Sequence, residues 1–111
     1  MTICDRFDVV EVPFPFSDAP KAKRRKALVL SSRGFNDGNS SSVLMMITSA
    51  ARSRWLGDVA IQQWRKAGLR KPCVARPKLF TLDNRLILSK AGTLTDSDCR
   101  RVVAALREAL P

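Results

Sequence analysis

The first candidate for chemistry is a run of cations inside the chain. Five of the six residues from Lys21 to Lys26 are lysine or arginine, and the apolar stretch 27–30 follows at once. A strand over that stretch would hold the last cations in fixed positions, and fixed guanidinium groups are what phosphate recognition and phosphate chemistry require. The alternative is a solvated loop that keeps the protein soluble, and charge alone does not decide between the two.

The composition favours a polyanionic partner. The chain has 111 residues, with 20 lysines and arginines against 10 aspartates and glutamates, and its net charge is +10. The length predicts a single domain, 1–111, and the basic residues concentrate at 21–33 and 65–78. Such a balance suits nucleic acid, an acidic protein segment or an anionic membrane surface. A membrane is the least favoured, because no apolar run approaches the ~20 residues of a span and no signal peptide is evident, so we expect a cytoplasmic protein.

The chain contains no histidine, which removes Ser-His-Asp and Cys-His nucleophile systems, histidine-ligated metals and the usual general base. Cys4, Cys73 and Cys99 are odd in number and widely spaced, which argues against a disulfide framework and against a zinc site. We therefore expect no metal and no cofactor. An enzyme built on this chain would have to use arginine, lysine, carboxylate, hydroxyl or thiol groups.

Apolar and β-branched runs predict a series of short strands. The first covers 8–16, and because Pro13 and Pro15 cannot donate ladder hydrogen bonds we expect it at a sheet edge or ending in a bulge. A strand over 27–32, fully apolar until Ser31, is expected to be central. The remaining predictions are a turn at 17–20, a mobile loop or hairpin tip at 33–42, strands at 43–48, 57–61 and 85–88, and an extended segment at 71–82 interrupted by Pro72 and Pro77.

Two segments predict helices. Residues 62–67 suggest one or two turns closed by Gly68, a common residue after a helix end. The terminal helix starts after Thr95, with Asp96 and Asp98 in its first turn, where the helix dipole favours anions. Its apolar face is expected to hold Cys99, Val103, Leu106 and Leu110, and Met45 and Met46 of the third strand are expected in the core. The pattern favours a mainly β fold, a compact barrel-like sheet with a short inserted helix and a packed C-terminal helix.

Six segments in order resemble the PemK/MazF family, the toxin components of bacterial toxin–antitoxin pairs. The order and spacing hold from about Arg6 to Leu110. The matching segments are Asp8-Val9-Val10 with Pro13-Phe14-Pro15-Phe16-Ser17-Asp18, Arg24-Arg25-Lys26-Ala27-Leu28-Val29-Leu30-Ser31, Ile47-Thr48-Ser49, Ala67-Gly68-Leu69-Arg70-Lys71-Pro72, Arg76-Pro77-Lys78-Leu79-Phe80-Thr81-Leu82-Asp83 and Gly92-Thr93-Leu94-Thr95.

The resemblance implies a small SH3-like barrel of the CcdB type, usually dimeric. It also implies a metal-independent endoribonuclease that cuts single-stranded RNA at short sequences and is neutralised by a cognate antitoxin. The net charge of +10 favours an acidic segment in that antitoxin. In the family an arginine that opens the second strand and a threonine that ends the third serve catalysis. Those positions are Arg25 and Thr48 here, with Arg24 left open as an alternative.

The chain departs from the family pattern at three positions. Lys26 stands where a proline usually follows the catalytic arginine, Phe7 where a glycine usually precedes the first aspartate, and Cys73 where a serine is frequent. The first departure bears on how Arg25 is aimed, and the third on a polar contact near the RNA.

Further residues are expected to contact RNA around the two catalytic positions. Trp55 could stack on an unpaired base or pack in the core, and for Trp64 we favour the core. Cations would attract the phosphate backbone or an acidic antitoxin segment. The predicted RNA-binding residues are Arg24, Lys26, Ser49, Trp55, Lys71, Arg76 and Lys78.

Two other functions remain open. A gyrase poison of the CcdB type would act through an apolar C-terminal tip containing tryptophan, and this chain has no tryptophan after Trp64. A non-catalytic barrel that grips nucleic acid or an acidic partner is the stronger alternative, and Lys26 in place of proline is its best support.

Overall fold

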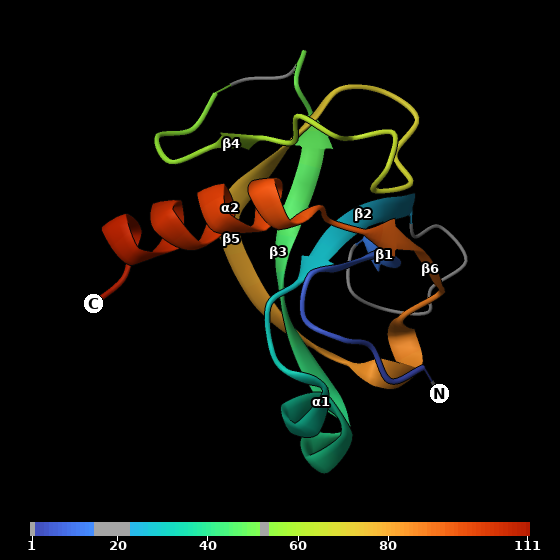
Figure 1. Ribbon diagram of the computed structural model, residues 1–111. Coiled ribbons are helices and arrows are strands. Elements are labelled where there is room, and N and C mark those ends of the chain that lie inside the picture. Colours follow the sequence, from blue (N-terminus) through green and yellow to red (C-terminus); the bar gives the residue numbers. More distant parts are fainter. Residues whose placement is uncertain (1, 15–22, 52–53) are drawn as a thin grey trace.

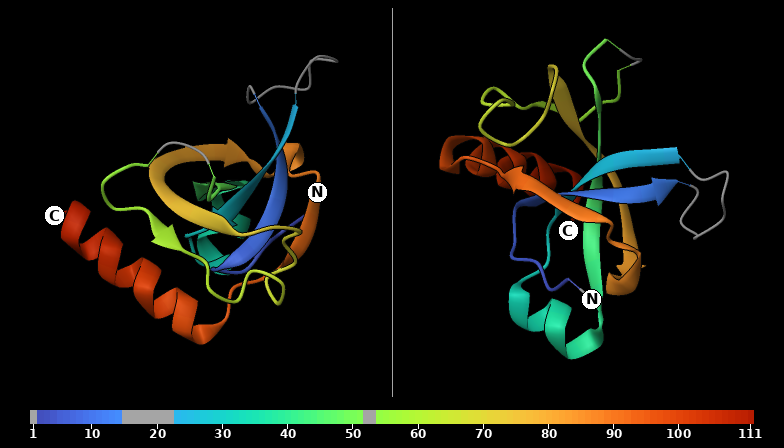
Figure 2. Two further views of the ribbon diagram at one scale, coloured as in Figure 1. Left: turned by 90° about the horizontal axis from the view of Figure 1, so that it is seen from above. Right: turned by 90° about the vertical axis from the view of Figure 1, so that its right-hand side faces the viewer.

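The computed structural model describes residues 2–14, 23–51 and 54–111, and within these ranges it contains one antiparallel sheet of six strands. The sheet is strongly curled, so that β1, β2 and β6 cross over β3 and β5 as half a barrel, and α2 lies along one side (Figures 1 and 2). The strand order is β4-β5-β3-β2-β1-β6. The elements are β1 (Asp8–Phe14), β2 (Lys23–Val29), α1 (Arg33–Asn39), β3 (Ser41–Ser49), β4 (Val59–Ala60), β5 (Cys73–Asp83), the 3₁₀ helix η1 (Asn84–Leu86), β6 (Ser89–Thr93) and α2 (Asp96–Ala109).

The mainly β fold with a packed C-terminal helix is confirmed, and so is the central place of β2. The expected edge position of β1 is wrong, because β1 lies between β2 and β6. Pro13 is tolerated because β6 pairs with β1 only from Asp8 to Glu11, while Pro13 itself pairs with Arg24 of β2. The bulge lies between Val9 and Val10, away from the prolines. The predicted turn at 17–20, together with Pro15 and Lys21, lies outside the described residues.

The expectation of a loop or hairpin tip at 33–42 is wrong, since residues 33–39 form α1 and β3 begins at Ser41. Ser32 caps the helix, accepting a hydrogen bond from the backbone N–H of Phe35 at 3.3 Å. Asn36 is fully buried, and its amide donates to the carbonyl oxygen of Cys4 at 2.9 Å. A long-range hydrogen bond from a buried asparagine thus orders a segment whose glycines and serines favour a loop.

The segment 85–88 was expected to be a strand, which is also wrong. Its first residues belong to η1, where a carboxylate oxygen of Asp83 accepts from the backbone N–H of Arg85 at 2.9 Å. The buried Asn84 donates from its amide to the carbonyl oxygen of Asn36 at 2.8 Å. The apolar pattern that suggested a strand reflects Ile87, which is buried in the core directly after this turn.

The segment 62–67, expected to form one or two helical turns, is not a helix but a series of turns with one helix-like hydrogen bond, and Gly68 closes it as predicted. The Ala67 N–H donates to the carbonyl oxygen of Gln63 at 3.1 Å, and Gly68 has a φ of +86°. A Cβ at Gly68 would lie 2.1 Å from the carbonyl oxygen of Ala91, and one at Gly92 would lie 2.4 Å from that of Ala67. Two segments that carry the family resemblance therefore meet here, and glycine lets their backbones touch.

The core has a cluster on each face of the curled sheet. One contains Leu28, Met45 and Ile47 and packs against α2, and the other contains Val12, Ala27 and Leu44. On α2 the fully buried apolar residue is Val102, whereas Leu110 is exposed, so the predicted helix face is shifted. Cys99 and Leu106 are half-buried against the core, as expected, and Val103 lies in an outer groove.

Phe7 occupies a position that suits glycine. Its φ is +70°, a left-handed conformation that costs a non-glycine residue about 1–3 kcal/mol. Hydrogen bonds to Val29 and from Leu94 hold its backbone, and its ring packs against the core. The glycine that the family usually has here would adopt this backbone without strain.

Among the described residues, no helix is long and apolar enough to cross a membrane.

Candidate active site

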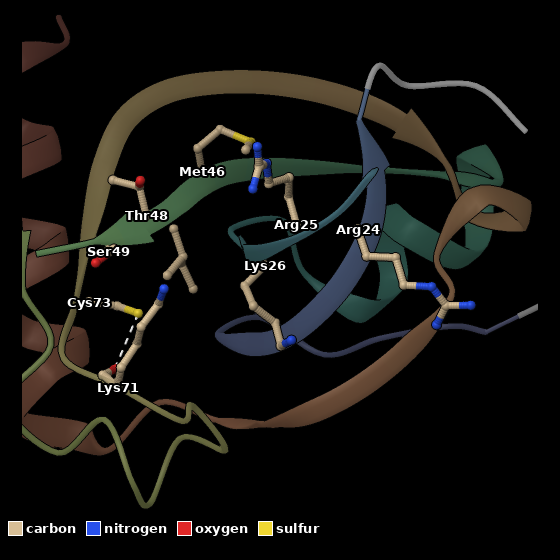
Figure 3. Close-up of a pocket in the computed structure, with 9 residues that line it drawn as sticks. Arg24, Arg25, Lys26, Met46, Thr48, Ser49, Lys71 and Cys73 are labelled. Carbon is tan, nitrogen blue, oxygen red and sulfur yellow. Dashed lines mark hydrogen bonds between the residues drawn. The ribbon is translucent and has the colours of Figure 1, made fainter. Parts of the chain in front are cut away.

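A cavity of about 310 Å³ opens where β2 and β3 separate (Figure 3). Ala27 pairs with Met46 at the last rung of the β2–β3 ladder. Because side chains alternate along a strand, Arg25 and Thr48 lie beyond that rung at corresponding positions and on the same face as Met46. The lining residues are Arg24, Arg25, Lys26, Met46, Ile47, Thr48, Ser49, Lys71 and Cys73.

The alternation also separates Arg25 from its two cationic neighbours. Glu11 of β1 accepts from Arg24 Nη1 through Oε1 and from Lys26 Nζ through Oε2, each at 2.9 Å. Arg25 lies on the opposite face and pairs with none of the described carboxylates. In Figure 3 its guanidinium points toward Met46, and Arg24 points away from Thr48. The arginine that shares a face with Thr48 is therefore Arg25.

Glu11 is ionised at neutral pH. The hydrogen bond from Lys26, followed by that from Arg24, lowers the pKa of its carboxyl. The charge on Lys26 is thus partly balanced on the face away from Arg25. Sequence reasoning missed Glu11, and the available signal was a single carboxylate within the otherwise apolar stretch 9–14. That it faces Lys26 follows only from the strand register.

The other wall of the cavity is formed by Ser49, Lys71 and Cys73. Burial raises the pKa of the Cys73 thiol, which donates to the carbonyl oxygen of Lys71 at 3.3 Å, so the group stays neutral and is a weak nucleophile. Met45 is buried as predicted, but Met46 is only half-buried and lines the cavity. The wall therefore offers a hydroxyl and an exposed ammonium, and none of the described residues that line the site is a carboxylate.

The remaining predicted RNA-binding residues lie in a second group. Arg76 donates through Nε and Nη2 to the two carboxylate oxygens of Asp58, at 3.1 and 3.0 Å. Its guanidinium lies 5.3 Å from the centre of the Trp55 ring, and Lys78 Nζ lies 5.7 Å from it. Trp55 is 44% exposed, while Trp64 packs against the core as expected. Asp58 is the second residue that sequence reasoning missed.

In the described part of the chain, no three or more His, Cys, Asp or Glu side chains are grouped so that they could hold a metal ion.

Comparison with known proteins identifies the family. Residues 5–110 match the model for the PemK-like, MazF-like toxin of type II toxin–antitoxin systems. A search of curated proteins gave no match.

Solved structures share the fold at low sequence identity. The chain is similar to MazF in a MazE–MazF crystal structure from Deinococcus radiodurans, with a TM-score of 0.77 and 19% identity over 97% of this chain and 96% of that one. It is also similar to an endoribonuclease from mycobacterial species, with a TM-score of 0.74 and 18% identity over 98% and 92% of the two chains. The Mycobacterium tuberculosis toxin MazF-mt6 matches with a TM-score of 0.72 and 18% identity, over 92% of this chain and 94% of that one.

The curled sheet, the packed terminal helix and the family match over residues 5–110 agree with one another. The chain belongs to the family of PemK-like, MazF-like toxins of type II toxin–antitoxin systems.

Proposed function

We propose that the protein is an endoribonuclease that cleaves single-stranded RNA at short sequences without a metal ion. The observation that carries the proposal is the meeting of Arg25 and Thr48 in one cavity, on the same face of two separating strands. A guanidinium beside a hydroxyl suits a phosphodiester, because the planar fork grips two phosphate oxygens at once. Lys71 and Lys26 at the same cavity add attraction for the flanking phosphates.

The reaction uses the substrate's own nucleophile. The 2′-oxygen attacks the adjacent phosphorus and loses its proton to water, the bond from phosphorus to the 5′-oxygen breaks, and that oxygen takes a proton from water. The products are a 2′,3′-cyclic phosphate and a 5′-hydroxyl. Arg25 stabilises the extra negative charge on the phosphoryl oxygens, and Thr48 donates one hydrogen bond to them. Arginine is a poor proton donor because its pKa exceeds ~12, so charge stabilisation is its main role.

The test is cleavage of single-stranded RNA by the purified protein in the presence of EDTA. Cleavage with a cyclic phosphate product is expected, and Arg25→Ala should reduce the rate about 100–1,000-fold. Arg107→Ala removes the same charge from the outer side of α2 and should cleave at the wild-type rate. Circular dichroism confirms that both variants are folded. Wild-type cleavage by Arg25→Ala would show that Arg25 has no catalytic role.

The proposed partner is a separately encoded antitoxin whose acidic segment covers the cavity around Arg25 and competes with RNA. The net charge of +10 supports this, because it favours capture of an acidic segment. Because members of the family are usually dimeric, we propose that this toxin is a homodimer. Light scattering on the purified toxin tests this directly.

A second candidate is a barrel that binds RNA or an acidic partner without cleavage. The observation that favours it is Lys26 beside Arg25, held by Glu11, where the family usually has a proline. Binding without cleavage across a broad panel of RNA sequences would select this alternative, while one cleaved sequence in the panel would reject it.

A further inference from the structure

A second cavity of about 390 Å³ adjoins the first one. Ser49 lines both cavities and directly follows Thr48 on β3. The second cavity therefore lies next to the site of Arg25 and Thr48. The volume lies within the ~300–1,000 Å³ range of small-molecule sites. The residues that line it are Ser49, Ala50, Arg54, Trp55, Asp58, Ala60 and Val74.

Trp55 is exposed at this cavity and yet fixed in place. Its backbone N–H donates to a carboxylate oxygen of Asp58 at 2.9 Å, and its carbonyl oxygen accepts from the Asp58 N–H at 3.2 Å. Asp58 is fixed in turn by the ion pair with Arg76, in which both side chains are largely buried, at 14% and 11% exposure. An exposed aromatic ring on a closed turn with a buried ion pair beneath it resembles a binding platform more than a core residue.

Trp55 lines the cavity, whereas the two cations that contact its ring come from β5. Arg76 and Lys78 both contact the ring, but neither lines the cavity. The other walls are small and apolar at Ala50, Ala60 and Val74, which suits a flat ring inserted between them and Trp55. Stacking on an aromatic side chain contributes about 1–3 kcal/mol per base and accepts any base.

Arg54 supplies the selectivity. Its side chain is exposed at the cavity and carries donors in a planar fork. A fork of donors matches guanine, whose O6 and N7 are adjacent acceptors, whereas adenine presents a donor beside N7. The carboxylate oxygens of Asp58 already accept hydrogen bonds from Arg76 and from the Trp55 N–H. The charged group in this cavity that remains to recognise a base is therefore the Arg54 guanidinium.

We propose that this second cavity is the subsite for a nucleobase beside the scissile phosphate, that the base stacks on Trp55, and that Arg54 makes guanine the preferred base. The assignment rests on the proposed placement of the phosphate at Arg25 and Thr48. It adds a substrate specificity that the catalytic cavity alone does not supply.

The test measures binding without cleavage. Four 2′-O-methyl RNA heptamers carry six uridines and a central guanosine, adenosine, cytidine or uridine, and methylation removes the nucleophile. In a Trp64→Phe background the fluorescence reports Trp55 alone. The guanosine heptamer should quench Trp55 and bind tightest. Trp55→Ala should weaken it roughly 5- to 150-fold, and Trp55→Phe less, because a phenyl ring still stacks.

Variants at Arg54 separate selectivity from charge. Arg54→Lys keeps the charge but loses the fork, and should bring the four heptamers to nearly equal affinity. Arg107→Ala on α2 is the matched control and should leave the preference intact. Binding that never quenches Trp55, or a guanine preference that survives Arg54→Lys, would overturn the subsite. If the heptamers bind as expected but unmodified RNA is not cut, the subsite stands and the proposed nuclease activity fails.

Discussion

Glu11 and Lys26 face each other across the β1–β2 pair, and Lys26 Nζ donates to Glu11 Oε2 at 2.9 Å. The same carboxylate accepts from Arg24 Nη1, so one acid restrains both cations that flank Arg25. Arg24 is 70% exposed and Lys26 31% exposed, which means that both can turn toward a phosphate once released. Where the family usually has a proline, this chain thus has Lys26, and Glu11 on the neighbouring strand is its ion-pair partner.

Replacing this acid should strengthen RNA binding. Glu11→Gln leaves an amide that cannot balance Arg24 and Lys26, so both cations become available to the RNA backbone. We expect the slope of log affinity against log salt to steepen by about 0.7–1.4, the change for one or two further phosphate contacts on a single strand. Asp83→Asn is the control, because it also removes a charge paired with an arginine, Arg85. Asp83 ends β5 opposite Ser41, at the other end of β3 from Thr48. Equal slopes for both variants would contradict a role for Glu11 at the site.

Arg24 and Arg25 should differ in what they do for the reaction. Arg24→Ala removes a cation on the face away from Thr48, so we expect kcat to stay within about threefold of the wild type while KM rises. Arg25→Lys keeps the charge but loses the planar fork and should lower kcat about tenfold or more. Single-turnover cleavage rates separate the two effects. A larger loss of kcat for Arg24→Ala than for Arg25→Lys would reverse the assignment.

Local patterns in the sequence were enough for the elements with strong periodicity and not for those fixed by distant contacts. The helix after Thr95 and the apolar half of β2 could be predicted, because each carries its own apolar spacing. The strand was expected over 27–32, but β2 begins within the cationic run at Lys23 and ends at Val29. The helix α1 could not be, because it is stabilised by the buried Asn36, whose partners Cys4 and Asn84 lie far away in the sequence. The same holds at the site, where Glu11 and Asp58 matter through partners on other strands.

Gly68 should be far less replaceable than Gly34. Gly68→Ala would place a methyl group 2.1 Å from a backbone oxygen at a φ of +86°, so we expect a loss of more than about 2 kcal/mol of unfolding free energy. Gly34→Ala puts the same methyl group on α1 with no atom within 4 Å and should be neutral or stabilising by up to about 1 kcal/mol. Urea denaturation measures both, and similar stabilities for the two variants would mean that the turn and β6 do not touch as described.

Asp98 should make the fold sensitive to acid. Burial acts to raise the pKa of its carboxyl, but hydrogen bonds from the Gln63 and Gln62 N–H groups and from Arg101 outweigh it and lower the pKa. A carboxyl with a lowered pKa in the folded state stabilises the protein above its unfolded pKa, near 4, and this stabilisation is lost as the pH falls through the folded pKa.

Asp98→Asn should therefore cost about 2–4 kcal/mol at pH 7, and the difference from the wild type should shrink steadily below pH 4. Asp96→Asn, at an exposed position in the same helical turn, should cost less than about 1 kcal/mol. Urea denaturation from pH 7 to pH 2 gives both curves. A constant difference between Asp98→Asn and the wild type across that range would show that the carboxylate charge is not what stabilises this helix start.

The proposed competition between antitoxin and RNA predicts a salt-dependent association rate. An acidic, poorly folded segment is drawn to the cations around Arg25, and this attraction acts over only ~8–10 Å at physiological ionic strength. The association rate of an acidic antitoxin peptide should therefore fall at least about tenfold between 50 and 500 mM salt, while the dissociation rate changes less. Lys71→Gln, which removes an exposed cation at the cavity, should slow association, whereas Arg107→Gln on α2 should not.

Stopped-flow mixing gives the association and dissociation rates, and cleavage assays in the same buffers show whether the peptide displaces RNA. A peptide that inhibits cleavage while RNA stays bound would act outside the cavity, and the model of one shared site would have to be abandoned.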